Sequence, residues 1–290
     1  MQKLKLSKLI AGTMSWGAWG KNLTTSDMSS LIVGCCENGI STFDHADIYG
    51  DYTTEAQFGQ ALSETKIDRN KIQLISKCGI QLVSNNRKTV VKHYNYSNKH
   101  ITESVENSLR NLKTDYLDVL LLHRPSPLLH PDEVAEAIFK LIRDKKILEF
   151  GVSNFSPQQT EVLRQKINIE YNQIQFSASE LGAMTNGSLD FLLQHHIRPM
   201  AWSPLGNVLK ATDEKSIRIK TVVDILAKKY NVANDVLLLA WIMKHPAGIL
   251  PVFGTTDMNR IKNMQQAESL EIEIEDWFLV YQTSLGRRVP

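Results

Sequence analysis

The chain has 290 residues, 42% of them hydrophobic, and its 33 basic and 31 acidic residues leave a net charge of +2. This balance offers no basic field to neutralise phosphates, so we expect neither nucleic acid nor a membrane surface as a partner. Three cysteines are too few for a disulfide framework or a structural zinc site. The N-terminus lacks a signal-like apolar segment, and no run reaches the roughly 18 apolar residues of a membrane span, so the sequence indicates a soluble, cytoplasmic protein.

Short apolar runs alternate with helical patterns along the whole chain. The stretch 4–6 alternates polar and apolar residues, and we expect it to form one arm of a short N-terminal hairpin. A helix that ends at Asn38-Gly39 separates the first run from the second. The eight runs that we expect to form strands are 9–13, 40–43, 72–76, 117–122, 147–152, 169–176, 197–202 and 249–252.

The pattern of these runs predicts an α/β fold. Strands that are apolar along most of their length are buried on both faces, and alternation with helices means that they pair in parallel. Eight such units fit a (β/α)8 TIM barrel, which we expect to form a single domain over residues 1–290 with an extra C-terminal helix. The alternative, an open doubly wound sheet, lacks the Gly-rich phosphate loop that would follow its first strand.

The longest stretch without a regular pattern is 79–98, directly after the third expected strand. Loops of this length are usually functional or disordered. We therefore expect it to form a wall or lid of a substrate pocket. The candidate lining residues of that pocket are Trp16, Trp19, Tyr52, His93 and Tyr94.

Polar side chains follow most of the expected strands, at the end where a (β/α)8 barrel places its chemistry. The second strand delivers Asp44 and, after a turn, Tyr49; the third ends in Lys77 and the fourth in His123. Each residue alone has an ordinary structural explanation, such as a packed tyrosine or a lysine that extends to solvent. Their occurrence together at one end of one barrel favours an active site.

A metal site is the other chemistry that such residues could indicate. Asp44, His45 and Asp47 lie close together in sequence, but His123 is the one histidine that convincingly ends a strand. A catalytic metal in a barrel usually needs several histidines at strand ends, so we expect no metal.

Five ordered motifs resemble those of the aldo-keto reductases. They are Phe-Asp-His-Ala-Asp-Ile-Tyr-Gly at 43–50, Ser-Lys at 76–77, Leu-His at 122–123, Gly-Val-Ser-Asn-Phe at 151–155 and Trp-Ser-Pro-Leu-Gly at 202–206. Together they span nearly the whole chain, and the likeness is closest to the bacterial branch of YdhF-like oxidoreductases. The resemblance implies an oxidoreductase that reduces aldehydes or ketones to alcohols with NADPH.

The resemblance also implies a catalytic role for four residues. Tyr49 would give a proton to the developing alkoxide, and a cationic Lys77 beside its oxygen would lower the pKa of the phenol. Asp44 would hold the lysine in place. His123 would donate to the carbonyl oxygen and orient it.

By the same resemblance, NADP(H) would lie extended on the barrel without a separate nucleotide-binding domain. Ser153, Asn154 and Gln175 would hydrogen-bond the carboxamide. Trp202 would stack on the nicotinamide, where many relatives use a tyrosine. The contacts to the pyrophosphate, the 2'-phosphate and adenine would come from Ser203, Leu205, Gly206, Gly254, Thr255, Thr256, Arg260 and Asn263.

Two departures from the family pattern affect the choice of cofactor. Gly254 stands where many relatives have a lysine, and Asn263-Met264 replaces a Glu-Asn pair that clamps adenine. One cation fewer weakens recognition of the 2'-phosphate, and Asp257 would weaken it further. Arg260 can still stack on adenine and pair with the phosphate, so we expect NADPH rather than NADH.

Two other functions remain open from the sequence alone. The barrel could be an NADPH-binding regulatory or redox-sensing subunit with little turnover, or an isomerising or lyase barrel with a phosphate-bearing substrate. The expected partner is a small-molecule carbonyl substrate, and the expected assembly is a monomer or a weak homo-oligomer.

Overall fold

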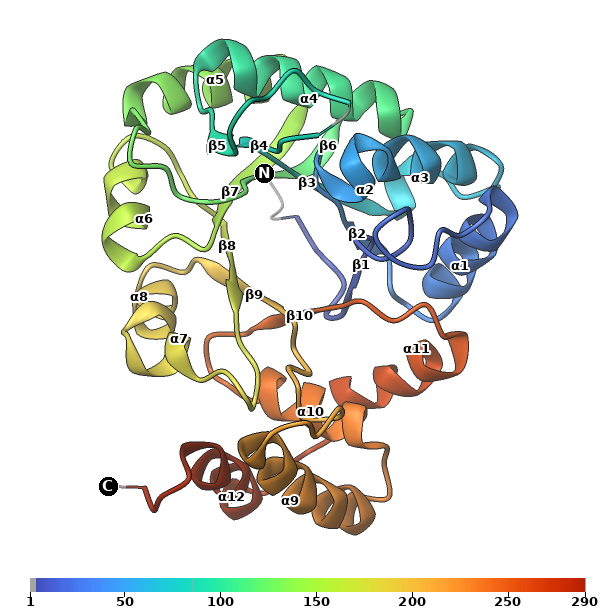
Figure 1. Cartoon of the computed structure of the whole chain (residues 1–290), viewed down its shortest axis with the longest axis vertical. Coiled ribbons are helices and arrows are strands. Elements are labelled where there is room, and N and C mark those ends of the chain that lie inside the picture. The colour runs from blue at the N-terminus through green and yellow to red at the C-terminus, as the bar shows by residue number, and fades with distance from the viewer. Residues whose placement is uncertain (1–3, 85, 290) are drawn as a thin grey trace. The chain divides into compact units, whose positions relative to one another are not determined.

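A computed structural model of the chain describes residues 4–84 and 86–289. The main sheet is a closed barrel with the strand order β1-β10-β9-β8-β7-β6-β3-β2 (Figure 1). Its strands are β1 (Ile10–Gly12), β2 (Thr42–Asp44), β3 (Gln73–Cys78), β6 (Leu117–Leu122), β7 (Ile147–Ser153), β8 (Tyr171–Gln175), β9 (Arg198–Trp202) and β10 (Leu250–Phe253). This arrangement confirms the predicted (β/α)8 barrel.

Helices separate the strands along the chain. They are α1 (Thr25–Glu37), α2 (Tyr49–Tyr52), α3 (Thr54–Ser63), α4 (Asn98–Leu112), α5 (Pro131–Arg143), α6 (Pro157–Arg164), α7 (Gly182–Thr185), α8 (Ser188–Gln194), α9 (Glu214–Tyr230), α10 (Asn234–Met243), α11 (Met258–Met264) and α12 (Ile274–Leu285). Local sequence explains several helix starts. At α6, for example, the Ser156 side chain accepts from the backbone N–H of Gln159, and Pro157 supplies a preset first turn.

The chain divides into two compact units. The first unit ends at Asn172 and also includes Gly254–Thr256; the second comprises Gln173–Phe253 and the residues from Asp257 onward. In the first unit β2 pairs in parallel with β1 and β3, and β6 pairs in parallel with β3 and β7. In the second unit β9 and β10 pair in parallel.

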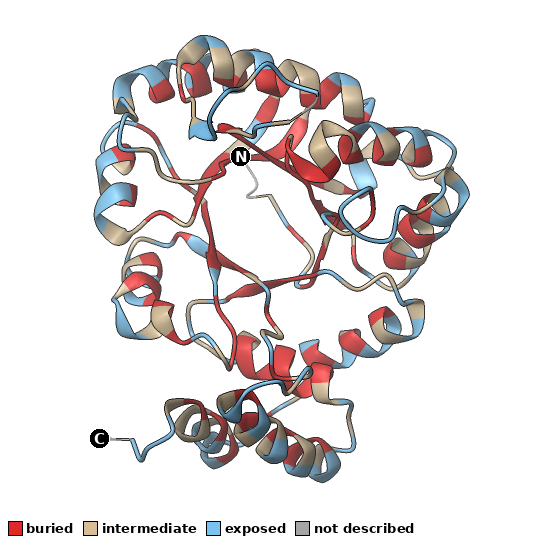
Figure 2. Cartoon of the chain, viewed as in Figure 1, coloured by how far each residue is buried: buried red, intermediate tan, exposed pale blue. Residues whose placement is uncertain are grey.

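Most positions in the strands of the first unit are buried on both faces, as their apolar sequences require, while Leu148 near the start of β7 is exposed. All six residues of β6 are buried, and the buried positions in Figure 2 are concentrated in the strands and, for most helices, on one side of the helix. The polar exception in β6 is Asp118, whose carboxylate accepts from Arg69 and from the backbone N–H of Leu74. A buried charge is thereby paired rather than left in an apolar core.

The N-terminal hairpin expected at 4–6 is wrong for the described residues, which form no strand before β1. Ser7 instead exchanges two hydrogen bonds with Thr42: its N–H donates to Thr42 Oγ1 at 2.9 Å, and its Oγ accepts from the Thr42 N–H at 3.1 Å. Leu6 is buried. The alternation that suggested a strand therefore reflects one buried leucine in a segment held by side-chain hydrogen bonds.

The 79–98 segment is more regular than expected. It contains a small antiparallel sheet of β4 (Ile80–Gln81) and β5 (His93–Tyr94). Gly79, with a φ of +109°, permits the turn into this sheet, because a Cβ there would lie 2.0 Å from the Tyr96 ring. The Tyr96 hydroxyl donates to the carbonyl oxygen of Arg124 and anchors the end of the segment.

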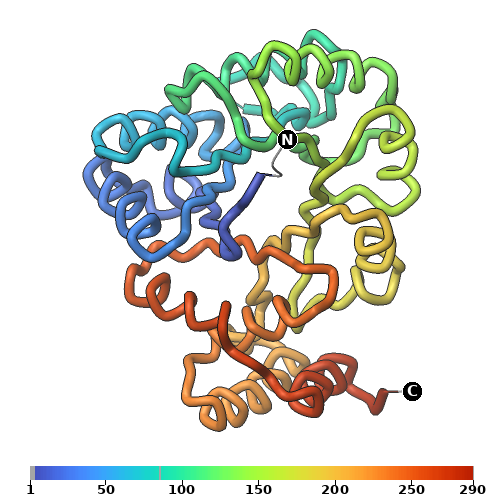
Figure 3. The backbone as a smooth tube through the Cα atoms, turned by 180° about the vertical axis from the view of Figure 1, so that it is seen from behind, coloured from blue at the N-terminus to red at the C-terminus, as the bar shows by residue number. Residues whose placement is uncertain are grey.

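Aromatic stacking organises the second unit. Trp241 of α10 stacks between Phe176, with ring centroids 5.8 Å apart, and Trp277 of α12, at 5.2 Å. Each of the two indole N–H groups donates to the backbone carbonyl of the other tryptophan at 3.0 Å. Helix α12, which confirms the expected extra C-terminal helix, lies beside α9 in both views (Figures 1 and 3).

None of the helices in the described part of the chain is long and apolar enough to cross a membrane.

Helices α3 and α4 cross at Gly59, and this contact gives a test of the packing. A Cβ on Gly59 would lie 2.1 Å from the Asn111 carbonyl oxygen, which is backbone and cannot rotate away. We expect Gly59→Ala to lower the free energy of unfolding by about 1–3 kcal/mol, as overpacking does, measured by urea denaturation. The exposed neighbouring residue, Gln60, provides the control, since Gln60→Ala should change the free energy of unfolding by less than about 0.5 kcal/mol. Equal stability of the two variants would contradict the close crossing.

Candidate active site

The turn that carries Tyr49 has a strained backbone. Gly50, Asp51 and Tyr52 have φ angles of 60°, 58° and 69°, in the left-handed region. At Gly50 a Cβ would also lie 2.4 Å from Thr54 Oγ1, so glycine is needed there. Non-glycine residues with such angles are costly and cluster at functional sites.

Lys77 gathers the end of β2 and the Tyr49 turn around one ammonium group. Its Nζ donates to Asp44 Oδ2 at 2.7 Å, to the His45 carbonyl oxygen at 2.7 Å and to the Tyr49 hydroxyl at 3.1 Å. The lysine side chain is fully buried. These contacts use all three of its N–H donors, so both its position and its charge are fixed by the site.

Burial and these contacts set the protonation states. Burial pulls the pKa of Lys77 down, but Asp44 and Tyr49 together hold it above its ordinary value. Burial also raises the pKa of Tyr49, and the Lys77 charge offsets only part of that rise. Lys77 thus acts on the Tyr49 pKa in the expected direction, but burial outweighs it and the pKa lies above its ordinary value. The phenol keeps its proton at neutral pH, while Lys77 reduces the cost of giving that proton away.

His123 lies next to Tyr49 at the end of β6. The two rings meet edge to face with centroids 6.1 Å apart, and the backbone N–H of His123 donates to the Cys78 carbonyl oxygen at 3.0 Å. Burial, reinforced by the charge of Lys77, holds the pKa of His123 well below its ordinary value. Its Nδ1 is buried without a partner among the described residues. A neutral imidazole of this kind can donate one N–H to a ligand.

The residues expected to line a substrate pocket fall into two groups. Trp19 is 45% exposed and its ring lies 6.2 Å from that of Tyr49. Tyr52 and Tyr94 pack against the apolar cluster that contains Tyr49, and His93 is exposed on β5. Trp16 is different, because it is fully buried against Phe43 and Phe58. The expectation for Trp16 is wrong: it is a core residue.

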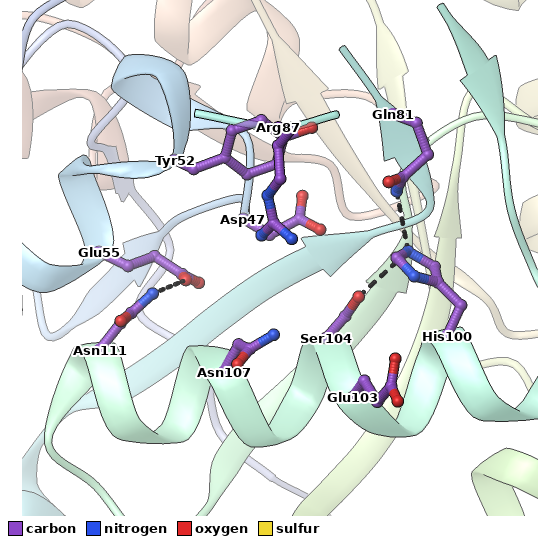
Figure 4. A pocket seen from close by; sticks show the side chains of 10 residues that line it. All are labelled: Asp47, Tyr52, Glu55, Gln81, Arg87, His100, Glu103, Ser104, Asn107 and Asn111. Atoms are coloured by element: carbon purple, nitrogen blue, oxygen red, sulfur yellow. Dashed lines mark hydrogen bonds between the residues drawn. The ribbon is translucent and has the colours of Figure 1, made fainter. Parts of the chain in front are cut away.

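A small polar cavity of about 60 Å³ lies beside the Tyr49 turn (Figure 4). Its volume suits a few water molecules rather than a substrate. Its lining residues are Asp47, Tyr52, Glu55, Gln81, Arg87, His100, Glu103, Ser104, Asn107 and Asn111. Asp47 Oδ1 is buried without a hydrogen-bond partner among the described residues, and burial together with Glu55 raises the pKa of this carboxyl well above its usual range.

The first unit also holds several of the residues expected to bind the cofactor. Ser153 is buried at the end of β7 and accepts from Asn154 Nδ2 at 2.8 Å. Asn154 has a φ of 61°, a second case of strained backbone directly after a strand. In the short segment Gly254–Thr256, Gly254 is exposed, the two threonines are half-buried, and the Gly254 carbonyl accepts from Ser15 Oγ at 3.0 Å.

Others lie in the second unit, Gln175 at the end of β8 and Trp202 to Gly206 at and after the end of β9. Gln175 and Ser203 are exposed, and Trp202 and Leu205 are half-buried. Ser203 has a φ of 50°, and Gly206 also has a φ of 50° with no room for a Cβ, which would lie 1.9 Å from Ser179 Oγ. Strained backbone thus follows β9 as it follows β7.

The start of α11 is partly occupied by its own side chains. Asp257 Oδ1 accepts from the backbone N–H groups of Asn259 and Arg260 at 2.9 and 3.3 Å. These two backbone N–H groups are therefore not free to bind an anion. Arg260 Nε pairs with Asp235 Oδ2 at 2.9 Å, which orients the guanidinium, and Asn263 is exposed.

Within the described residues, no group of three or more His, Cys, Asp or Glu side chains could hold a metal ion.

The family comparison agrees with this geometry. The sequence model of the "Aldo/keto reductase family" matches residues 8–282. The chain belongs to the aldo/keto reductase family. Its relatives include the oxidoreductase YcsN of Bacillus subtilis, 40% identical over 100% of this chain and 98% of that protein. They also include the oxidoreductase YdhF of Escherichia coli, 36% identical over 95% of this chain and 93% of that protein, which confirms the expected branch of the family.

Two further similarities bear on function and fold. A 6-dehydroglucose reductase of Agrobacterium fabrum is 36% identical over 100% of both chains. The structure of an aldo/keto reductase from Klebsiella pneumoniae, in complex with NADP and acetate, is 23% identical over 95% of this chain and 90% of that one, with a TM-score of 0.78. At this identity, the structural likeness shows the shared fold.

Sequence reasoning missed Glu55, a buried carboxylate in α3 that accepts from Ser76 Oγ at 2.6 Å. One signal was available. Glu55 lies three residues before Phe58 and four before Gly59, so it belongs to the inward face of a helix where charge is uncommon.

His45 allows a test of the electrostatics through the pH dependence of stability. Burial, with the charge of Lys77, lowers the pKa of His45 to about 3. The unfolded chain binds a proton on this histidine near pH 6.5, so the stability from neutral His45 is full above that pH and is lost as pH falls towards about 3. We expect His45→Asn to reduce the slope of unfolding free energy between about pH 7 and about pH 5 by up to about 1.4 kcal/mol per pH unit.

Urea denaturation at each pH measures that slope. The exposed Gln60, which does not titrate, provides the control, since Gln60→Ala should leave the slope unchanged. A slope that is the same in His45→Asn and in the unaltered protein would contradict the neutral, buried state of His45.

Proposed function

We propose that the protein is an NADPH-dependent reductase of aldehydes or ketones with Tyr49 as the proton donor. The observation that carries this proposal is the single Lys77 ammonium that contacts both Asp44 and the Tyr49 hydroxyl inside the barrel. A reductase needs an acid that is protonated at neutral pH and whose conjugate base is stabilised where it forms. Tyr49 meets both conditions, because burial raises the pKa of its hydroxyl and Lys77 stabilises the phenolate.

The chemistry divides between the cofactor and the protein. NADPH, when bound, supplies the hydride that the carbonyl carbon gains. Tyr49 gives its hydroxyl proton to the carbonyl oxygen, and the electron pair left on the phenolate faces Lys77 Nζ. His123, as a neutral imidazole, donates an N–H to the same oxygen and orients it. Asp44 keeps the ammonium charged and aimed at the phenol, so it acts through Lys77.

The residues at the later strand ends fit a nicotinamide cofactor. Asn154 and Ser203 keep costly left-handed angles directly after β7 and β9, which supports a binding role for both strand ends. Ser153 and Gln175 offer the polar groups that a carboxamide needs, and the half-buried Trp202 offers a flat aromatic face. Leu205 and Gly206 would follow along the pyrophosphate.

The preference for NADPH rests on Arg260. Its Nε is paired with Asp235, which leaves the terminal nitrogens of a fixed guanidinium for the 2'-phosphate. Thr255 and Thr256 would add hydroxyl donors, while Gly254 leaves room without adding charge, and Asn263 would meet adenine. Asp257 opposes this preference, because its carboxylate would repel a phosphate. That repulsion is reduced, since the carboxylate caps α11 and accepts from two backbone N–H groups.

The proposed substrate is a small polar carbonyl compound. The 6-dehydroglucose reductases among the relatives support an aldehyde on a sugar as the first compound to test. Trp19, Tyr52, His93 and Tyr94 are the proposed side chains that line its pocket. We propose further that residues 1–290 act as one domain, because the family match at 8–282 runs through both compact units.

Titration with NADPH and then NADH, followed by a panel of aldehydes and ketones, tests the proposed function. We expect the fluorescence of NADPH to change when it binds and NADH to bind more weakly. We also expect the nicotinamide absorbance to fall when at least one carbonyl compound is added, because the cofactor is oxidised. Tight NADPH binding with no turnover would point to a regulatory subunit, and no binding of either nucleotide would overturn the proposal altogether.

Tyr49→Phe tests the proton donor. The variant keeps the ring that packs against His123 and removes the hydroxyl, so we expect kcat to fall by about 100-fold or more, as the loss of a general acid does. The dissociation constant of NADPH should stay within about threefold, since only the reacting group has changed. Tyr116→Phe is the matched control, because Tyr116 packs with Arg69 and should keep full turnover. A Tyr49→Phe enzyme with most of its rate would show that another group is the acid.

A further inference from the structure

Glu55 connects the segment that carries Tyr49 with the strand that carries Lys77. Successive side chains of a strand point to opposite faces, so Ser76 points away from the side where Lys77 meets Asp44 and Tyr49. On that other face, Ser76 Oγ donates to Glu55 Oε1 at 2.6 Å, and both residues are almost fully buried.

We propose that Glu55 is a positioning residue of the active site, which fixes Lys77 relative to the Tyr49 hydroxyl by holding Ser76; this rests on the proposed function. The contacts close a ring. From Tyr49 the chain runs to Glu55, the Glu55 carboxylate holds Ser76, the next residue is Lys77, and Lys77 Nζ returns to the Tyr49 hydroxyl at 3.1 Å.

The strained turn explains why such a ring is needed. Between Tyr49 and Glu55 lie Gly50, Asp51 and Tyr52, all with left-handed φ angles. A backbone of this kind persists only where its surroundings hold it. The turn is tied to β3 at both ends: before it, the Asp47 N–H donates to the Lys77 carbonyl oxygen at 3.0 Å, and after it Glu55 accepts from Ser76.

The carboxylate of Glu55 is costly to bury, which argues that its hydrogen bonds are used. Besides Ser76, it accepts from Ser108 and from Asn111 Nδ2, both on α4. Figure 4 shows Glu55 and Asn111 facing each other at one end of the polar cavity. Glu55 therefore joins three elements, and the question is whether it serves the catalytic strand or only the packing of α3 on α4.

Ser76 and Ser108 separate these two roles, because both are buried serines that donate to the same carboxylate. Only Ser76 adjoins Lys77. The experiment therefore compares Ser76→Ala with Ser108→Ala, measuring the melting temperature, kcat and KM for a carbonyl substrate, and the pH profile of kcat.

We expect both variants to melt a few degrees lower, since each loses one buried hydrogen bond. Only Ser76→Ala should also lose kcat, by about tenfold or more at unchanged KM, because a misplaced catalytic group is costly to the rate. The limb of its pH profile that reports the Tyr49 proton should move as well. Equal kcat in the two variants would overturn the proposal and leave Glu55 as a packing residue.

A second variant protects the test against a folding failure. Glu55→Gln keeps the volume and an oxygen that can accept from Ser76, so kcat should stay within about threefold of the unaltered enzyme if position is what matters. A loss of kcat in Glu55→Gln as large as that in Tyr49→Phe, at an unchanged melting temperature, would overturn the positional role.

A direct titration distinguishes failure of this inference from failure of the proposed function. The absorbance change on ionisation of Tyr49 is obtained by subtracting the Tyr49→Phe signal, and it needs no turnover. We expect the Tyr49 titration to shift in Ser76→Ala and to stay in place in Ser108→Ala. If no carbonyl compound is reduced but the Tyr49 titration shifts in Ser76→Ala, the reductase proposal fails and the positioning role of Glu55 stands. If the Tyr49 titration does not shift in Ser76→Ala, the positioning role fails.

Discussion

The buried ion pair between Lys77 and Asp44 is the interaction on which the rest of this site depends. An ammonium with no exposed surface would lose its proton or destabilise the fold if it stood alone. The Asp44 carboxylate at 2.7 Å offsets that cost, and the remaining N–H groups of Lys77 hold the His45 carbonyl and the Tyr49 hydroxyl. Because removing one partner of such a pair typically costs about 3–5 kcal/mol, the fold and the proposed chemistry depend on the same contact.

The two histidines that neighbour this pair add no charge to the site. His45 and His123 are both buried and neutral, since burial and the Lys77 charge disfavour their protonated forms. A buried cation in surroundings of low dielectric acts strongly on the polar groups that it contacts, and the Tyr49 hydroxyl is one of them. The strained turn after Tyr49 and its ties to β3 then determine how close that hydroxyl stays to the charge. The Lys77 charge and the geometry of the turn therefore both act through one contact, the 3.1 Å between Lys77 Nζ and the Tyr49 hydroxyl.

The sequence predicted the barrel well because strands buried on both faces appear in the sequence as short apolar runs. The run of β6 is an example, since its predicted bounds match the structure residue for residue. Strand ends could be read for the same reason, which is why Asp44, Lys77 and His123 were expected to lie at one end of the barrel. Most of the errors concern contacts between distant residues. Nothing local distinguishes Trp16 in the core from a pocket tryptophan, and the raised pKa of Tyr49 depends on a burial that no motif records. The tie between Glu55 and Ser76 was likewise invisible, because it joins residues from two elements on the face away from the motifs.

The most direct test of the central claim is carbonyl reduction by a variant that lacks the buried ion pair but leaves no charge unpaired. Lys77→Met together with Asp44→Asn removes the ammonium and the carboxylate at once, so the barrel should still fold. The account predicts that this double variant binds NADPH with a dissociation constant within about threefold of the unaltered protein. It also predicts a fall in kcat of about 100-fold or more, since the Tyr49 phenolate loses its stabilising charge. Turnover close to that of the unaltered protein would contradict the account, because the acid would then work without Lys77.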